Sequence, residues 1–109
     1  MKRYSVIITP TAEADIVDSF IWGCYEWGIS EAQKLAQDIR DAVLTRLSTF
    51  PMRFPLAPDK DGSKNEYRHL FVGRYRVIFH IEKQTVWVIH VRGAFSNNSD
   101  DEYFEGVDE

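Results

Sequence analysis

Apolar and polar residues alternate along the stretch from Tyr67 to Gly93, which predicts a set of β-strands. Val, Ile, Tyr, Phe and Trp dominate it, and these residue types fit a half-buried sheet. We place the strands at Tyr67–Val72, Arg74–Glu82 and Thr85–Gly93, with a tight turn or bulge at Gly73 and a polar turn at 82–84. One face of this meander suits a core. The other presents cationic and titratable groups, which are Arg74, Arg76, His80, His90 and Arg92.

Upstream, apolar residues recur at helical spacing and predict a first helix. Thr9 suits its N-cap and Pro10 its first turn, and Gly28 is a natural stop. An apolar stripe runs through Ile16, Phe20, Cys24 and Trp27, and Val17 and Ile21 widen it. Gly23, inside the helix, is expected to permit close helix packing.

A second helix follows directly. Ser30 with Gln33 three positions later matches a capping box, and Pro51 is expected to end the helix. Its apolar stripe comprises Ala32, Leu35, Ala36, Ile39, Val43, Leu47 and Phe50. Only Gly28 and Ile29 separate the helices, so we expect an antiparallel helical hairpin.

The fold class that follows is α+β in two layers. The run Tyr4–Thr9 reads as an N-terminal strand, and the segment 51–66 reads as a loop because of its prolines and mixed charge. The expected order is strand, helical hairpin and three-stranded antiparallel meander, with the hairpin covering one sheet face. Residues 1–95 should form a single domain, and 96–109 an acidic C-terminal tail.

Charge is distributed unevenly over the 109 residues. The net charge is −4, yet the tail holds six acidic residues and no basic ones. Of 17 acidic residues the body therefore keeps 11, against 13 basic ones, and is mildly positive. A body of this charge does not by itself argue for nucleic-acid binding.

Several classes of protein are disfavoured. No apolar run approaches the ~20 residues of a membrane helix, and Cys24, the only cysteine, excludes a disulfide framework and a cysteine-based zinc site. Nucleophile motifs, phosphate-binding glycine loops and metal-ligand spacing are also missing. We expect a cytoplasmic protein with no cofactor, metal or membrane partner.

The cationic face and the aromatic residues each have two interpretations. If Arg68, Arg74, Arg76 and Arg92 align, they form a patch suited to phosphate or carboxylate recognition, but a solvated sheet face also needs polar residues. Three histidines (His69, His80 and His90) suit acid–base chemistry or simple packing in the sheet. Trp22 and Trp27 suit a core or an interface better than a ligand cage.

The ordered set of residues also resembles a known family. Arg68-His69-Leu70, the run Val72–Phe79 and Ile89–Arg92 look like the C-terminal half of the ParE/RelE toxin superfamily of bacterial type II toxin–antitoxin modules. The likeness extends upstream through the first strand and both helices, over about residues 4–93. The fold that it implies is the one derived above.

The resemblance implies two competing activities. RelE-like members cleave mRNA on the ribosome, and in that case Arg76 would stabilise the phosphate in the transition state, with Arg92, His90 and Tyr103 as further catalytic candidates. ParE-like members poison DNA gyrase, act in plasmid stabilization and need no ribonuclease site. Here the last strand is followed by an acidic tail, which would repel RNA, and the segment 28–32 looks closer to the ParE branch. We therefore favour a non-enzymatic gyrase poison, with the ribonuclease or a non-toxic antitoxin-binding member as alternatives.

Either toxin implies partners. A cognate antitoxin would wrap the helical hairpin and the sheet, with Trp22, Tyr25 and Trp27 as anchors and Arg68 and Arg74 as further contacts. DNA gyrase, or the ribosome with its mRNA, would be the target. A homodimer or a toxin–antitoxin hetero-oligomer is compatible with this interpretation. The acidic tail is expected near Arg76 and Arg92, or against a partner.

Overall fold

The computed structural model describes residues 3–58 and 66–93, and its element order matches the α+β prediction. In chain order the elements are β1 (Ser5–Ile8), α1 (Pro10–Trp27), α2 (Ile29–Arg46), the 3₁₀ helix η1 (Pro51–Arg53), β2 (Arg68–Val72), β3 (Tyr75–Glu82) and β4 (Thr85–Gly93). The acidic tail, including Tyr103, lies outside the described residues. None of the helices described is long and apolar enough to cross a membrane.

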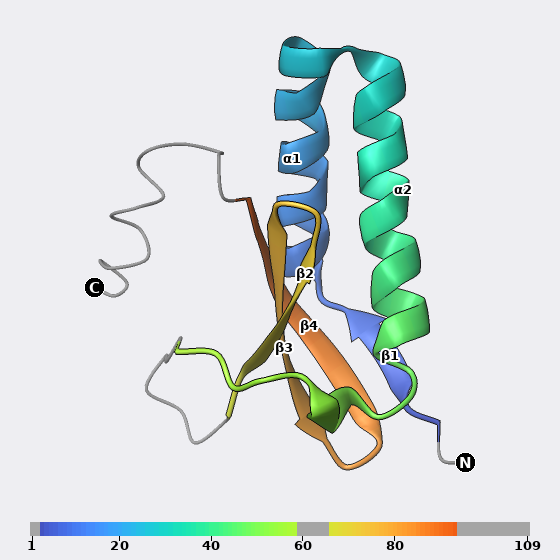
Figure 1. Cartoon of the computed structure of the whole chain (residues 1–109), viewed down its shortest axis with the longest axis vertical. Coiled ribbons are helices and arrows are strands. Elements are labelled where there is room, and N and C mark those ends of the chain that lie inside the picture. Colours follow the sequence, from blue (N-terminus) through green and yellow to red (C-terminus); the bar gives the residue numbers. More distant parts are fainter. Residues whose placement is uncertain (1–2, 59–65, 94–109) are drawn as a thin grey trace.

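A four-stranded sheet in the order β1-β4-β3-β2 forms one layer (Figure 1). The meander β2-β3-β4 is antiparallel, whereas β1 pairs in parallel with β4. The first strand of the chain therefore lies beside the last one. The two helices form the second layer, and the loop end of their hairpin projects beyond the sheet (Figure 1).

The start of α1 is fastened to β4 through one residue. Thr9 Oγ1 accepts a hydrogen bond from the Ala12 N–H (3.2 Å) and donates one to the Val88 carbonyl (2.7 Å). The predicted N-cap is therefore confirmed, and the same hydroxyl also fixes the helix to the sheet.

The hairpin turn is shorter than predicted. Gly28 alone separates the helices, with a φ of 97° that favours glycine. The capping box at Ser30 is wrong, because α2 begins at Ile29 and has no side-chain cap. Nearby, a Cβ on Gly23 would lie 3.3 Å from the Ala32 Cβ, so this glycine lets the helices approach closely.

The end of α2 also differs from the prediction. The helix stops at Arg46, four residues before Phe50. Phe50 adopts a left-handed conformation (φ 46°, ψ 52°) and is 63% exposed, so it does not belong to the apolar stripe. Most of the predicted apolar stripe of α2 is confirmed as buried. Its buried members are Ala32, Ala36, Ile39, Val43 and Leu47.

The core lies between the helices and one face of the sheet. Ile16 from α1 and Ile39 and Val43 from α2 meet strand residues such as Phe79 and Val88, all almost completely buried. The register between β3 and β4 shifts at Ile78/Phe79, where Ile89 is the extra residue of a β-bulge. The bulge keeps Val88 and Val91 in the same core cluster although they are three positions apart, a spacing that would put them on opposite faces of a regular strand.

Candidate functional site

The sheet face opposite the core is the first candidate surface, and we call it the outer sheet face. Alternation along the strands, read with the pairing register, assigns a fixed set of side chains to it. They are His69, Phe71, Arg76, Ile78, His80, Trp87 and Arg92; His90, although paired with Ile78 beside the bulge, is left out because its ring contacts Asp15 of α1. Ile78 is buried but lies outside the core cluster, as expected for a residue on this second face.

Two arginines stand side by side on this face. Arg76 of β3 is paired directly with Arg92 of β4. Like charges in such a position repel, because opposed Cβ atoms are only about 5 Å apart. On the other side, Arg76 Nη1 lies 3.1 Å from His69 Nδ1. Since a guanidinium can only donate, His69 accepts through Nδ1 and carries its proton on Nε2. The contact with His69 thus orients the Arg76 guanidinium, and Arg76 and Arg92 together make this part of the face strongly cationic, as recognition of an anion requires.

The other two arginines are placed differently. Arg68 is paired with Phe79, so its alignment with Arg76 is wrong, and the two lie on opposite faces. Its Nη1 donates to the carbonyls of Met52 (3.3 Å) and Phe54 (2.8 Å), which ties the segment after α2 to β2. Arg74 is exposed in the turn between β2 and β3, beside Gly73 with its φ of 62°.

The three histidines do not converge. The His80 ring packs edge-on against Tyr67, with centroids 5.8 Å apart, and His90 Nδ1 lies 3.3 Å from Asp15 Oδ2 on α1. His69 contacts Arg76 through its Nδ1. Within residues 3–58 and 66–93, no three His, Cys, Asp or Glu side chains are grouped as metal ligands would be.

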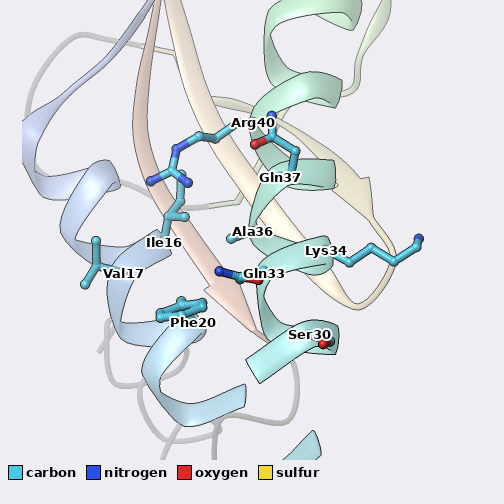
Figure 2. A pocket seen from close by; sticks show the side chains of 9 residues that line it. All are labelled: Ile16, Val17, Phe20, Ser30, Gln33, Lys34, Ala36, Gln37 and Arg40. Carbon is cyan, nitrogen blue, oxygen red and sulfur yellow. The ribbon is translucent and has the colours of Figure 1, made fainter. Parts of the chain in front are cut away.

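A groove between the helices is the second candidate surface (Figure 2). Its volume is about 640 Å³, and it is lined by Ile16, Val17, Phe20, Ser30, Gln33, Lys34, Ala36, Gln37 and Arg40. The α1 wall is apolar and the α2 wall is mostly polar. In Figure 2, Arg40 reaches from α2 toward α1, where it forms an ion pair with Glu13. We call this hollow the interhelical groove.

Aromatic side chains cluster near the loop end of the hairpin. The rings of Trp22 and Trp27 meet edge to face, with centroids 5.2 Å apart. Tyr25 is 86% exposed. Trp27 also lines a second hollow, of about 570 Å³, with Glu31, Lys34, Leu35 and Asp38. The predicted anchors thus lie together at one end of the molecule.

Comparison with known proteins gives a family. The model of the ParE toxin of the type II toxin–antitoxin system parDE matches residues 6–94, which is most of the chain. The protein belongs to the ParE toxin family. The matched span contains both the interhelical groove and the outer sheet face, and it ends where the acidic tail begins. Among curated proteins, no significant match is found.

Two solved structures share the fold of this ParE-family chain. One belongs to the chromosomal ParDE toxin–antitoxin system of P. aeruginosa, with 18% identity and a TM-score of 0.69 over 83% of this chain and 95% of that one. The other belongs to the RelBE2 toxin–antitoxin complex of Mycobacterium tuberculosis, with 20% identity and a TM-score of 0.61 over 85% and 93%.

The interhelical groove was missed when the ParE-family sequence was read alone. Its signal was the unusual width of the stripe on α1, where Val17 and Ile21 add to Ile16 and Phe20. In the structure Ile16 is buried, whereas Val17 remains 43% exposed. An apolar face broader than one neighbour can cover indicates room for a partner.

Proposed function

We propose that this ParE-family toxin poisons DNA gyrase and is neutralised by a cognate antitoxin bound along the interhelical groove. The observation that carries the proposal is the match of the ParE toxin family over residues 6–94. The activity requires no catalytic site, and the toxin acts by binding its target.

The groove supports an elongated partner segment. Its α2 wall extends from Ser30 to Arg40, which at 1.5 Å per residue is about 15 Å. An amphipathic helix laid in such a groove presents apolar side chains every three or four residues. These would pack on Val17 and Phe20, while Gln33 and Gln37 offer hydrogen bonds to its polar side.

Charge gives the partner segment a direction. Lys34 is a cation in the wall of the groove, and Arg40 marks one end. Both cations are paired within the chain, Arg40 with Glu13 and Lys34 with Asp38 (3.3 Å), but the Lys34 side chain is 71% exposed and that of Arg40 only 33%. Because an exposed pair exchanges partners at little cost, we expect the antitoxin to place acidic residues nearer Lys34. Trp22, Tyr25 and Trp27 would extend the interface beyond the groove as aromatic anchors, and Arg74 would contribute from the turn between β2 and β3. Arg68 is half-buried and already donates to the Met52 and Phe54 carbonyls, so we propose that only its exposed part contacts the antitoxin.

A supercoiling assay tests the gyrase target. Purified protein is added to gyrase, ATP and relaxed plasmid, and the topoisomers are separated on a gel. The proposal predicts dose-dependent loss of supercoiling or accumulation of cleaved plasmid, reversed by the cognate antitoxin. Normal supercoiling at a large excess of protein would exclude gyrase as the target.

The second candidate is a ribosome-dependent mRNA endoribonuclease. It is favoured by two observations, the pairing of Arg76 with Arg92 and the contact of Arg76 with His69. Together they offer two cations and an imidazole ring for a phosphate. His90 and Tyr103 remain catalytic candidates for this reaction. Primer extension on an mRNA under translation tests it: new 5′ ends that disappear in Arg76→Ala would support the ribonuclease.

The third alternative is a non-toxic family member that only binds antitoxin. Expression of the protein without its antitoxin distinguishes this alternative from the two toxins. Growth arrest without the antitoxin rules this alternative out, whereas normal growth at high expression supports it.

The oligomeric form, either a homodimer or a toxin–antitoxin hetero-oligomer, is measured by light scattering on the isolated protein and on the complex. We propose the cytoplasm as the site of action, because gyrase and the ribosome are both there.

A further inference from the structure

We propose that the acidic tail, residues 96–109, binds to the outer sheet face of its own chain. The surface combines a fixed pair of cations with apolar area, and the tail combines acidic and aromatic residues. The proposal goes beyond the gyrase and antitoxin interactions, since it assigns the outer sheet face an occupant within the same polypeptide.

Charge complementarity is the first argument. Arg76 and Arg92 are directly paired across β3 and β4, and Arg74 is exposed in the adjoining turn. Repulsion between opposed arginines is relieved when carboxylates lie over them. The tail supplies six carboxylates and no basic residue: Asp100, Asp101, Glu102, Glu105, Asp108 and Glu109.

Apolar complementarity is the second argument. Phe71 is paired with Arg76 on the side away from β4 and is 59% exposed, so the cations adjoin an uncovered aromatic ring. Tyr103 and Phe104 lie between the acidic residues of the tail. A segment that places carboxylates on the arginines therefore has aromatic side chains available for Phe71.

Connectivity is the third argument. β4 ends at Gly93, one residue after Arg92, so the tail leaves the fold at the edge of the cationic pair. Asp100 lies seven positions after Gly93, and this stretch spans up to about 24 Å when extended. Phe71 lies two strands away from Arg92, or about 10 Å. The tail is thus long enough to cross the outer sheet face.

Tethering makes weak contacts sufficient. An exposed ion pair contributes only about 0–1 kcal/mol, so a free acidic peptide would bind this face poorly. A short linker raises the effective concentration of the tail to roughly millimolar. Binding should therefore be intramolecular and should weaken with salt, because exposed charges are screened.

Paramagnetic relaxation in the full chain tests the proposal. Ser99→Cys in a Cys24→Ser background gives one attachment site for a spin label, since Cys24 is the only native cysteine. We expect amide signals of His69 and Phe71, distant in sequence from the label, to be lost in the oxidised sample and recovered on reduction. Loss confined to residues next to the tail, or loss over the helical hairpin instead, would overturn the proposal.

Two full-length variants test the role of charge. Neutralising the tail by Asp100→Asn, Asp101→Asn, Glu102→Gln and Glu105→Gln should restore the signals of β2. The matched control neutralises four acidic positions of the hairpin, by Asp18→Asn, Glu26→Gln, Glu31→Gln and Asp38→Asn, and should leave the broadening unchanged. Equal broadening in the tail variant, or its loss in the hairpin control, would overturn the charge argument.

A mixing experiment separates binding within one chain from binding between chains. Isotope-labelled protein without a spin label is mixed with spin-labelled protein that carries no isotope. Unchanged spectra of the mixture support intramolecular binding. Broadening of His69 and Phe71 in the mixture would instead assign the tail to a second copy and overturn the proposal as stated.

Discussion

Asp15 on α1 accepts a hydrogen bond from the backbone N–H of Val91 on β4, at 2.9 Å. The two residues are 76 positions apart, and the same carboxylate oxygen lies 3.3 Å from His90 Nδ1. The partner strand β1 pairs with β4 only as far as Val88. Just beyond the bulge, where β1 no longer pairs with β4, Asp15 therefore accepts the backbone hydrogen bond of β4. It joins the helical layer to the strand that carries Arg92.

Removing the Asp15 carboxylate should destabilise the fold. Asp15→Ala leaves the Val91 N–H without its acceptor, so the free energy of unfolding should fall by about 1–3 kcal/mol. Asp15→Asn, which retains a carbonyl oxygen, should cost less. Urea denaturation measures both. As a control, Asp18→Ala at an exposed position of α1 should change little, and equal losses for Asp15→Ala and Asp18→Ala would contradict the assignment.

Gly93 should tolerate no side chain. It is paired with Tyr75, and a Cβ at this position would lie 2.6 Å from the Tyr75 Cε1. Gly93→Ala should therefore cost about 1–3 kcal/mol of stability through overpacking. In a Tyr75→Leu background the cost of Gly93→Ala should shrink, because the opposing ring is gone. Additive losses in the double variant, measured by urea denaturation, would argue against a direct clash.

Tyr75 should make the fold sensitive to alkaline pH. Burial raises the pKa of its phenol above the ordinary value of 10.0, and a hydrogen bond with Ser19 lowers that pKa in part. Above about pH 10 the folded chain then holds this proton more tightly than the unfolded chain does. The protonated phenol of Tyr75 therefore contributes to the free energy of unfolding. This contribution is complete below pH 10 and is lost as the pH rises through the pKa of Tyr75 in the folded chain.

Replacement of the phenol tests this pH dependence. Tyr75→Phe should flatten the fall in unfolding free energy between pH 9 and about pH 11, whereas Tyr25→Phe, at an exposed position, should leave it as in the unaltered protein. Denaturation series at several pH values make the comparison. An identical fall in Tyr75→Phe would mean that other groups cause it.

A cation in the interhelical groove should weaken antitoxin binding. Val17→Lys places an ammonium group on the apolar wall, and we expect the dissociation constant to rise about tenfold or more. Met52→Lys adds the same group to an exposed position outside the groove and should leave the affinity unchanged. Calorimetry with the cognate antitoxin measures both affinities. Equal affinities would place the antitoxin elsewhere.

The sequence was sufficient for features that depend on neighbouring residues. Thr9, Pro10 and Gly28 set the limits of α1 by local capping and backbone geometry, and the 2-residue alternation located β3 and β4. Phe50 broke the pattern because its left-handed backbone turns the chain after α2, which periodicity does not reveal.

Features that depend on distant residues could not be read in this way. The parallel pairing of β1 with β4 and the bond from Val91 to Asp15 join segments 76 to 80 positions apart, and the residues next to Asp15 in the sequence do not indicate its partner. Similarly, the face occupied by Arg68 depends on the register of β2, which places it opposite Phe79. The interhelical groove requires two helices at a known separation.

Plasmid topology in cells that express the toxin without its antitoxin tests the central claim most directly. Plasmid DNA is taken at intervals after induction and its topoisomers are resolved on a gel containing an intercalator, while mRNA from the same culture is probed for cleavage. A gyrase poison predicts relaxed or broken plasmid while the mRNA remains intact. Unchanged supercoiling in arrested cells, with mRNA cut and the cutting abolished in Arg76→Ala, would contradict the account and favour the ribonuclease.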